Sequence, residues 1–140
     1  MALVVGYTPD ERGEAALHLA GMLARSFGDD LVVCSVISAH RAPGTARIDA
    51  EHHAFLDQTA DEALEQARAA LEAGIPATFV RRRARSAPAG LLEVADEHDA
   101  RMIVVGSWGE SPIRGAILGS TPHKLLHLSR RPVLCVPVRA

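Results

Sequence analysis

The sequence predicts a single α/β domain in which helices cover both faces of a parallel sheet. Short apolar runs alternate with segments whose apolar residues recur at helical spacing, so the expected order is βαβαβαβαβ. The runs are apolar on both faces, as is typical of buried parallel strands. Aromatic residues make up only 4% of the chain, so we expect a core of Val, Leu, Ile and Ala. These features indicate a doubly wound fold with right-handed crossovers.

The first strand and helix are expected within residues 3–28. LVVGY, residues 3–7, is an apolar run followed by a turn signal. Thr8 is expected to cap the helix, with Pro9 at its first position and Glu11 completing a capping box. Gly28 ends the helix. One helix face carries the apolar residues Ala16, Leu19, Ala20, Leu23 and Phe27.

The second strand is LVVCSVI, residues 31–37, and residues 38–49 are expected to form a loop. A long helix is predicted from Ala50 to Ala73, and Gly74 stops it. The apolar stripe of this helix consists of Leu56, Ala60, Ala63, Leu64, Ala67, Ala70 and Leu71.

The remaining elements follow the same alternation. The third and fourth strands are ATFVRRR, residues 77–83, and MIVVG, residues 102–106. Between them, Ser86 and Pro88 open a helix. A loop from residue 106 to 120 follows, then a helix that begins at Thr121 and Pro122 and runs through Leu128, and a last strand at residues 132–138.

Composition narrows the function classes. The 140 residues correspond to one domain, residues 1–140, with a formal net charge of −2, which favours neither nucleic acid nor an anionic membrane as a partner. The first residues, MALVVGY, resemble neither a signal peptide nor a membrane span. Cys34 and Cys135 match no metal or redox motif and are expected in the core, as in a reducing compartment. The sequence therefore predicts a cytoplasmic protein.

The stretch VVGSWGESPIRGAILGSTPHK follows the fourth strand, and ligands bind at the carboxyl ends of strands in this architecture. Gly119, Ser120 and Thr121 precede a helix, where free N–H groups and the helix dipole favour an anion. Arg114 adds a cation that can reach a phosphate. The alternative interpretation is structural: Gly106 makes a tight turn, Thr121 caps the helix, and the rest only connects the two elements. Neither the P-loop motif nor GxGxxG after the first strand is present.

The spacing Gly106-x2-Gly109-x9-Gly119-Ser120 matches, without a gap, the nucleotide-binding signature G-2x-G-9x-G-(S/T) of the universal stress protein family. The chain resembles this family over nearly its whole length. The resemblance implies a flavodoxin-like, Rossmann-like doubly wound domain with a five-stranded parallel sheet of strand order 3-2-1-4-5. It also implies a role in stress tolerance and binding of ATP or AMP, with or without Mg²⁺. The implied nucleotide-binding residues are Gly6, Thr8, Val36, Val105, Gly106, Gly109, Arg114, Gly119, Ser120 and Thr121.

The chain departs from the family pattern in two places. Thr8 stands where nucleotide-binding members usually carry an aspartate, and Asp10 compensates only if the turn brings it round. Trp108 and Glu110 occupy a region where a basic residue is common. Trp108 would either stack on a base or cover the loop, and a Glu110 directed inward would repel phosphate. The substitution at Thr8 favours a protein that acts without nucleotide.

Two surfaces are candidates for protein contacts. The resemblance implies a homodimer through the last strand, Val133 to Val138, whose ladder Pro137 would shorten because proline lacks an N–H. The basic cluster Arg81, Arg82, Arg83 and Arg85 is expected to be a solvated edge, or alternatively to bind an acidic, as yet unknown, protein partner.

Three functions stay open at this point. The first is an adenine-nucleotide-binding regulatory protein of the stress response. The second is a nucleotide-independent interaction module that acts through its dimer surface or its arginine edge. The third is a nucleotide-dependent enzyme such as a slow ATPase, although no catalytic triad, carboxylate pair or catalytic cysteine is recognisable. His123 would donate to a phosphate or only decorate its helix. The adjacent His52 and His53 are poorly placed to share one metal ion, so no metal site is predicted.

Overall fold

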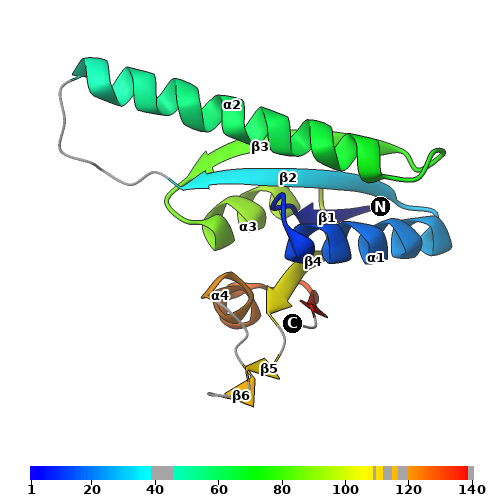
Figure 1. The fold of residues 1–140 in the computed structure, drawn as a ribbon. Coiled ribbons are helices and arrows are strands. Elements are labelled where there is room, and N and C mark those ends of the chain that lie inside the picture. Colours follow the sequence, from blue (N-terminus) through cyan, green and yellow to red (C-terminus); the bar gives the residue numbers. More distant parts are fainter. Residues whose placement is uncertain (39–45, 109, 112–114, 117–119, 139–140) are drawn as a thin grey trace.

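Five parallel strands form the central sheet of the protein, in the order β3-β2-β1-β4-β7 (Figure 1). The computed structural model describes residues 1–38, 46–108, 110–111, 115–116 and 120–138. The strands are β1 (Ala2–Gly6), β2 (Asp30–Ser38), β3 (Ala77–Ala84), β4 (Ala100–Trp108) and β7 (Val133–Val138). This order is the predicted 3-2-1-4-5 arrangement, with β7 as the fifth strand. The strand order reverses between β1 and β4, the place where ligands bind in doubly wound sheets.

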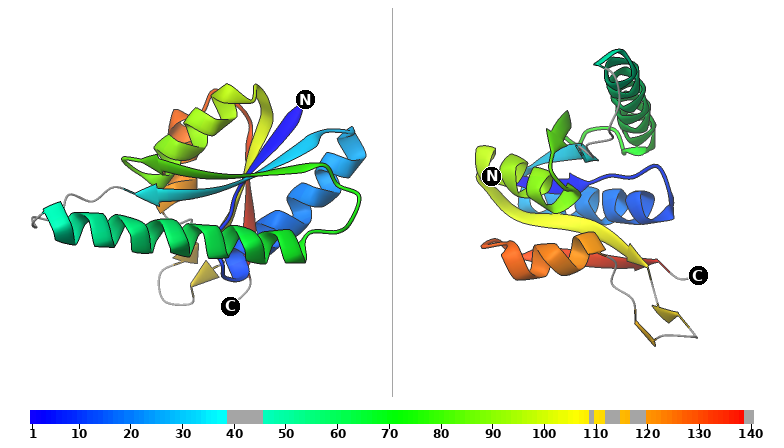
Figure 2. Two further views of the ribbon diagram at one scale, coloured as in Figure 1. Left: turned by 90° about the horizontal axis from the view of Figure 1, so that it is seen from above. Right: turned by 90° about the vertical axis from the view of Figure 1, so that its left-hand side faces the viewer.

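Helices cover both faces of the sheet, as Figure 2 shows. The helices are α1 (Glu11–Phe27), α2 (Ala46–Ala70), α3 (Ala87–Glu97) and α4 (Ser120–Leu128). α1 and α2 pack on one face, where Leu17 and Leu64 meet Val5 and Val33. α3 and α4 pack on the other face, which forms a second apolar cluster. Both faces of each central strand are thus buried, which explains why the strand sequences are apolar throughout.

The start of α1 differs from the prediction. Asp10, not Thr8, is the N-cap residue, and its carboxylate accepts hydrogen bonds from the amides of Arg12 and Gly13. Glu11 is the first helical residue, so Pro9 lies outside the helix and the expected capping box is wrong. A carboxylate that can accept two amide hydrogen bonds stabilises the helix start better than the Thr8 hydroxyl two residues earlier. The predicted end at Gly28 is confirmed, since Gly28 adopts φ 69°.

The boundaries of α2 were also mispredicted. The helix begins at Ala46 rather than Ala50, and it ends at Ala70 rather than Ala73, so Gly74 lies in the turn that follows. Its first turns extend beyond the end of β2 (Figure 1). The apolar stripe of the sequence begins only at Leu56, so the periodicity does not indicate the first turns of the helix.

The glycine-rich segment was expected to lack regular structure, and this is wrong in part. β4 continues to Trp108, and β5 (Glu110–Ser111) pairs with β6 (Gly115–Ala116) in a two-stranded antiparallel ladder. α4 starts at Ser120, one residue before the predicted start. Such short strands carry too few residues for a pattern to be visible in the sequence.

The arginines of β3 form ion pairs within the protein. β3 is an edge strand, and its alternation directs Arg81 and Arg82 to opposite faces. Arg81 reaches Asp61 of α2 at 2.8 Å, and Arg82 reaches Glu97 of α3 at 2.6 Å. These pairs support the interpretation of the cluster as a solvated edge, where charge also discourages unwanted strand pairing.

Two glycines allow the first turn of α1 to approach the ends of β1 and β4. A Cβ added to Gly13 would lie 1.7 Å from the carbonyl oxygen of Thr8. A Cβ added to Gly106 would lie 2.2 Å from the carbonyl oxygen of Arg12. In both cases the obstacle is backbone, which cannot rotate away as a side chain can. Gly106 is therefore required by the packing of α1, and neither a tight turn nor a positive φ accounts for it.

Replacing Gly106 by alanine is expected to lower the free energy of unfolding by about 1–3 kcal/mol, because the added methyl group overpacks against backbone. Gly21→Ala is the matched control, since its Cβ would meet only side-chain ends, the Cδ1 atoms of Ile75 at 3.2 Å and of Leu71 at 3.4 Å, and alanine favours the helix. The control variant should unfold within about 1 kcal/mol of the wild type. Urea unfolding without nucleotide measures both, and equal stability of the two variants would contradict the packing argument.

Candidate functional site

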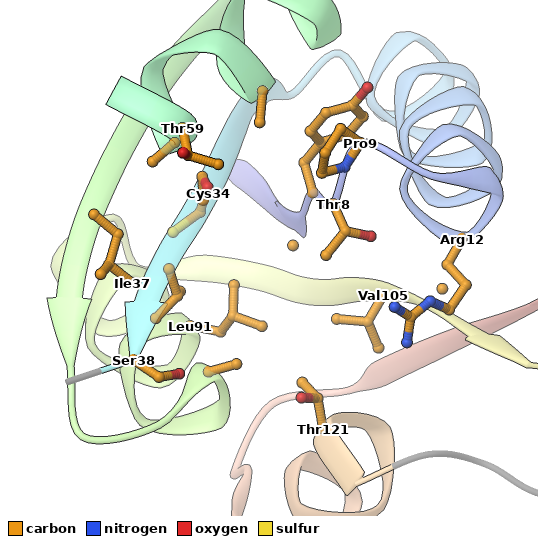
Figure 3. A pocket seen from close by; sticks show the side chains of 18 of the residues that line it. Thr8, Pro9, Arg12, Cys34, Ile37, Ser38, Thr59, Leu91, Val105 and Thr121 are labelled. Carbon is orange, nitrogen blue, oxygen red and sulfur yellow. The ribbon is translucent and has the colours of Figure 1, made fainter. Parts of the chain in front are cut away.

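A cleft of about 460 Å³ opens at the carboxyl ends of β1, β2 and β4 (Figure 3). α2 and α3 close one end of this cleft, and the first turns of α1 and α4 border the other. The cleft thus lies at the reversal of strand order, where the ends of neighbouring strands and helices diverge. A volume of this size suits a small organic ligand.

The cleft brings together the predicted site residues that the structure describes. They are Gly6, Thr8, Val36, Val105, Gly106, Ser120 and Thr121. The predicted residues Gly109, Arg114 and Gly119 lie outside the described residues, as do the side chains of Trp108 and Glu110. The assignment of these residues to a nucleotide stays a prediction, but the described members do line the same cleft.

One end of the cleft is mainly apolar, with the hydroxyl groups of Ser38 and Thr59 also on this side (Figure 3). Val36 and Ile37 from the end of β2 line this end, together with Leu56 of α2 and Leu91 of α3. Leu56 is half-buried and belongs to the helical stripe that the sequence assigned to the core. Apolar side chains arranged in this way can cover a flat aromatic ring and keep water from it.

The other end carries hydroxyl groups and a cation. Ser120 and Thr121 form the first turn of α4, whose unpaired amide groups and dipole favour an anion. Arg12 borders the same end, and Figure 3 shows its guanidinium directed toward the side of the cleft on which Thr121 lies. This end can therefore hold a phosphate group.

The sequence did not identify Arg12 as a site residue. The sequence does contain one indication of this role. A positive charge in the first turn of a helix is unfavourable with the helix dipole, so an arginine at this position suggests a function other than helix stability. The residues of α2 and α3 that line the cleft were missed for a different reason. Their apolar side chains follow the same helical spacing as core residues, and nothing in the pattern separates a cleft wall from a core.

Thr8, Asp10 and Arg12 form a hydrogen-bonded group at the edge of the cleft. The Thr8 hydroxyl donates to Oδ1 of Asp10 at 2.8 Å. Oδ1 also accepts from the amides of Arg12 at 3.0 Å and Gly13 at 3.1 Å, while Nη2 of Arg12 donates to Oδ2 at 3.0 Å. The turn does bring the Asp10 side chain round, but toward Thr8. Asp10 is not among the residues that line the cleft, so it does not replace the family's aspartate there.

The Asp10 carboxyl is ionised at neutral pH. Burial by itself would raise its pKa, but the hydrogen bonds from Arg12, Thr8 and Gly13 outweigh burial and hold the pKa below its ordinary value. An ionised carboxylate only accepts hydrogen bonds, so Thr8 is the donor in the hydrogen bond between the Thr8 hydroxyl and Asp10.

Two further titratable groups in the cleft wall are neutral at pH 7. Burial raises the pKa of the Cys34 thiol to about 12, so this cysteine is not a thiolate nucleophile. Burial also raises the pKa of Tyr7, whose hydroxyl donates to Glu14, and the negative charge of Glu14 raises it further. Within the described part of the wall, Arg12 is the only charged side chain.

Two other kinds of feature are absent from the described residues. No group of three or more His, Cys, Asp or Glu residues there is placed to hold a metal ion. In that same part of the chain, no helix combines the length and apolar character needed to cross a bilayer.

Comparison with known proteins points to one family. The profile of the universal stress protein family matches residues 1–137. A universal stress protein of Mycobacterium tuberculosis is 36% identical over 143 residues, which cover 99% of this chain and 49% of that protein. The chain thus spans about half the length of the curated relatives it matches.

Solved structures agree with this comparison. A universal stress protein from Archaeoglobus fulgidus is 26% identical with a TM-score of 0.72, covering 97% of this chain and 98% of that one. A universal stress protein solved in complex with cAMP is 28% identical with a TM-score of 0.66, covering 98% and 96% of the two chains.

The role of Asp10 as helix cap yields a test of stability. Asp10→Ala should lower the free energy of unfolding by about 1 kcal/mol at pH 7. Asp10→Asn keeps an oxygen acceptor at the cap and should lose less than half of that. Because the folded pKa is depressed, the contribution of the charge is present above the unfolded value of about 3.9 and is lost as the pH falls through the folded pKa. Denaturant unfolding from pH 7 to pH 2.5 measures this, and a difference between wild type and Asp10→Ala that grows below pH 4 would refute the assignment.

Proposed function

This chain belongs to the universal stress protein family, and we propose that it binds an adenine nucleotide, ATP or AMP, in the cleft and acts as a regulatory protein of the stress response. The observation that carries the proposal is the polarity of the cleft. An apolar end suited to a base lies opposite an end with Arg12, Ser120 and Thr121, which suits phosphate. The relative solved with cAMP supports an adenine nucleotide as the ligand.

In this proposal the base lies between the end of β2 and the residues of α2 and α3, with Val36 meeting it through the backbone. Its phosphates lie at the start of α4. The predicted residues Gly109, Arg114 and Gly119 would add contacts from the glycine-rich segment. Mg²⁺, if it accompanies the nucleotide, would be held by phosphate oxygens, because the described wall of the cleft offers no carboxylate to a hard cation.

A second candidate function is supported by its own observation. Gly106 has a structural reason in the packing of α1, and the Thr8 hydroxyl already donates to Asp10. Both features would persist in a domain of this fold that works as an interaction module without nucleotide. The slow ATPase and the cytoplasmic location stay predictions from the sequence.

We also propose a homodimer through β7. This strand lies at the edge of the sheet, where its outer backbone groups can pair with a second copy of the chain. Cys135 is partly exposed on this strand, and Val133 to Val138 are apolar apart from that thiol. Pro137 limits how far the ladder can extend.

The nucleotide proposal is tested by stripping the purified protein of small molecules and titrating AMP and ATP by calorimetry. We expect saturable binding near about 1 μM, a typical affinity for such a site. Arg12→Met should weaken binding by about 10- to 100-fold, since a charge-assisted hydrogen bond contributes about 1.5–3 kcal/mol.

The control for this experiment is Arg25→Met. Arg25 carries the same charge but lies in the last turn of α1, paired with Glu72 outside the cleft. Its replacement should leave the affinity unchanged. A wild-type protein that carries no nucleotide and ignores millimolar ATP would favour the interaction module instead.

The dimer proposal predicts the mass of the protein in solution. Sedimentation equilibrium at micromolar protein concentration should give twice the mass of the chain, because edge-strand pairing buries the apolar surface of β7. A mass of one chain across the whole concentration range would exclude this dimer without affecting the nucleotide proposal.

A further inference from the structure

The position of Thr8 divides the cleft into two parts. Thr8 projects between the apolar end, with Cys34 and Leu91, and the phosphate end, with Arg12 and Thr121 (Figure 3). A nucleotide that spans both ends places its base at one, its phosphate at the other and its sugar between them. Thr8 is therefore the polar side chain next to which the sugar would lie.

The backbone of Thr8 is held in place by the packing of α1. The carbonyl oxygen of Thr8 accepts a hydrogen bond from the amide of Asp10 at 2.8 Å. The same oxygen occupies the space that a Cβ atom on Gly13 would fill. The side chain of Thr8 is exposed to the cleft. A ligand thus meets a hydroxyl group whose position is set before binding.

The direction of the Thr8 hydrogen bond is set by its neighbour. Asp10 receives three donors besides Thr8, namely the amides of Arg12 and Gly13 and the guanidinium of Arg12. As an ionised carboxylate it has no proton to give, so the single hydroxyl proton of Thr8 points at Oδ1. The lone pairs of the hydroxyl oxygen remain for the ligand.

We propose that Thr8 is a specificity-determining hydrogen-bond acceptor, which selects ligands whose sugar carries a free hydroxyl as donor. The inference rests on the proposed nucleotide function and goes beyond it, because it assigns the hydroxyl oxygen of Thr8 the role of hydrogen-bond acceptor toward the ligand. The same polarity disfavours a phosphate or carbonyl oxygen next to Thr8, since two acceptors repel. Thr8 thereby also sets the direction in which the ligand lies along the cleft.

The test combines variants of Thr8 with ligands that lack one sugar hydroxyl. Affinities of AMP, 2′-deoxy-AMP and 3′-deoxy-AMP are measured by calorimetry for the wild type, Thr8→Val and Thr8→Ser. Valine has the shape of threonine but no acceptor, whereas serine keeps the hydroxyl within reach of Asp10.

The wild type should lose about fivefold to tenfold in affinity when one of the two hydroxyls is absent, the effect of one hydrogen bond. Thr8→Val should bind AMP more weakly by the same factor and should no longer distinguish AMP from that deoxy ligand. Thr8→Ser should discriminate as the wild type does. Equal losses in the wild type and Thr8→Val for both deoxy ligands would overturn the inference.

A fluorinated ligand tests the polarity itself. The AMP analogue with fluorine in place of the discriminated hydroxyl keeps its size but has no proton to donate. It should bind to the wild type no better than the deoxy ligand. Binding as tight as that of AMP would make Thr8 a donor and overturn the inference. Absence of any AMP binding to the wild type would overturn the nucleotide function and this inference together, whereas AMP binding without discrimination overturns this inference alone.

Discussion

The close approach of the α1 backbone to the ends of β1 and β4 is the constraint on which the candidate site depends. It holds only because Gly13 and Gly106 carry no side chain where the carbonyls of Thr8 and Arg12 lie. The contact fixes the height of α1 above the sheet and thus the position of the whole β1–α1 turn. The cleft lies directly beside this turn, so the hydrogen-bonding groups that border it are positioned by backbone packing rather than by a ligand.

The charged groups at the cleft differ in arrangement from those at the β3 edge. At the cleft, Asp10 holds Arg12 and Thr8 in a single hydrogen-bonded group, so one carboxylate caps a helix and sets the polarity of a site residue. At the β3 edge, by contrast, arginines pair with carboxylates on the helices that cover the sheet, and their charge is largely compensated. The basic run in the sequence thus corresponds to a solvated edge, while Arg12, at the start of α1 and paired with Asp10, borders the cleft.

The fold class follows from the sequence because buried parallel strands and amphipathic helices leave separate periodic patterns. The strand order followed only from the resemblance to a known family. The start of α1 was mispredicted because Thr8 and Asp10 are both competent caps, and only the path of the turn decides between them. The candidate site was predicted where glycine, serine and threonine stand before a helix, as at Ser120. It was missed at Leu56 and Leu91, where cleft walls and core share one spacing.

The sequence by itself determined the architecture, the end of the sheet at which a ligand would bind, and the family resemblance, because apolar periodicity and glycine spacing are local properties of the chain. Only the tertiary structure decided that Asp10 turns toward Thr8, that Arg12 borders the cleft with Ser120 and Thr121, and that Gly106 serves the packing of α1. These are relations between atoms in space, and most of them join separate elements. Their distances depend on how closely helices pack on strands, and a linear pattern of residue types does not contain that information.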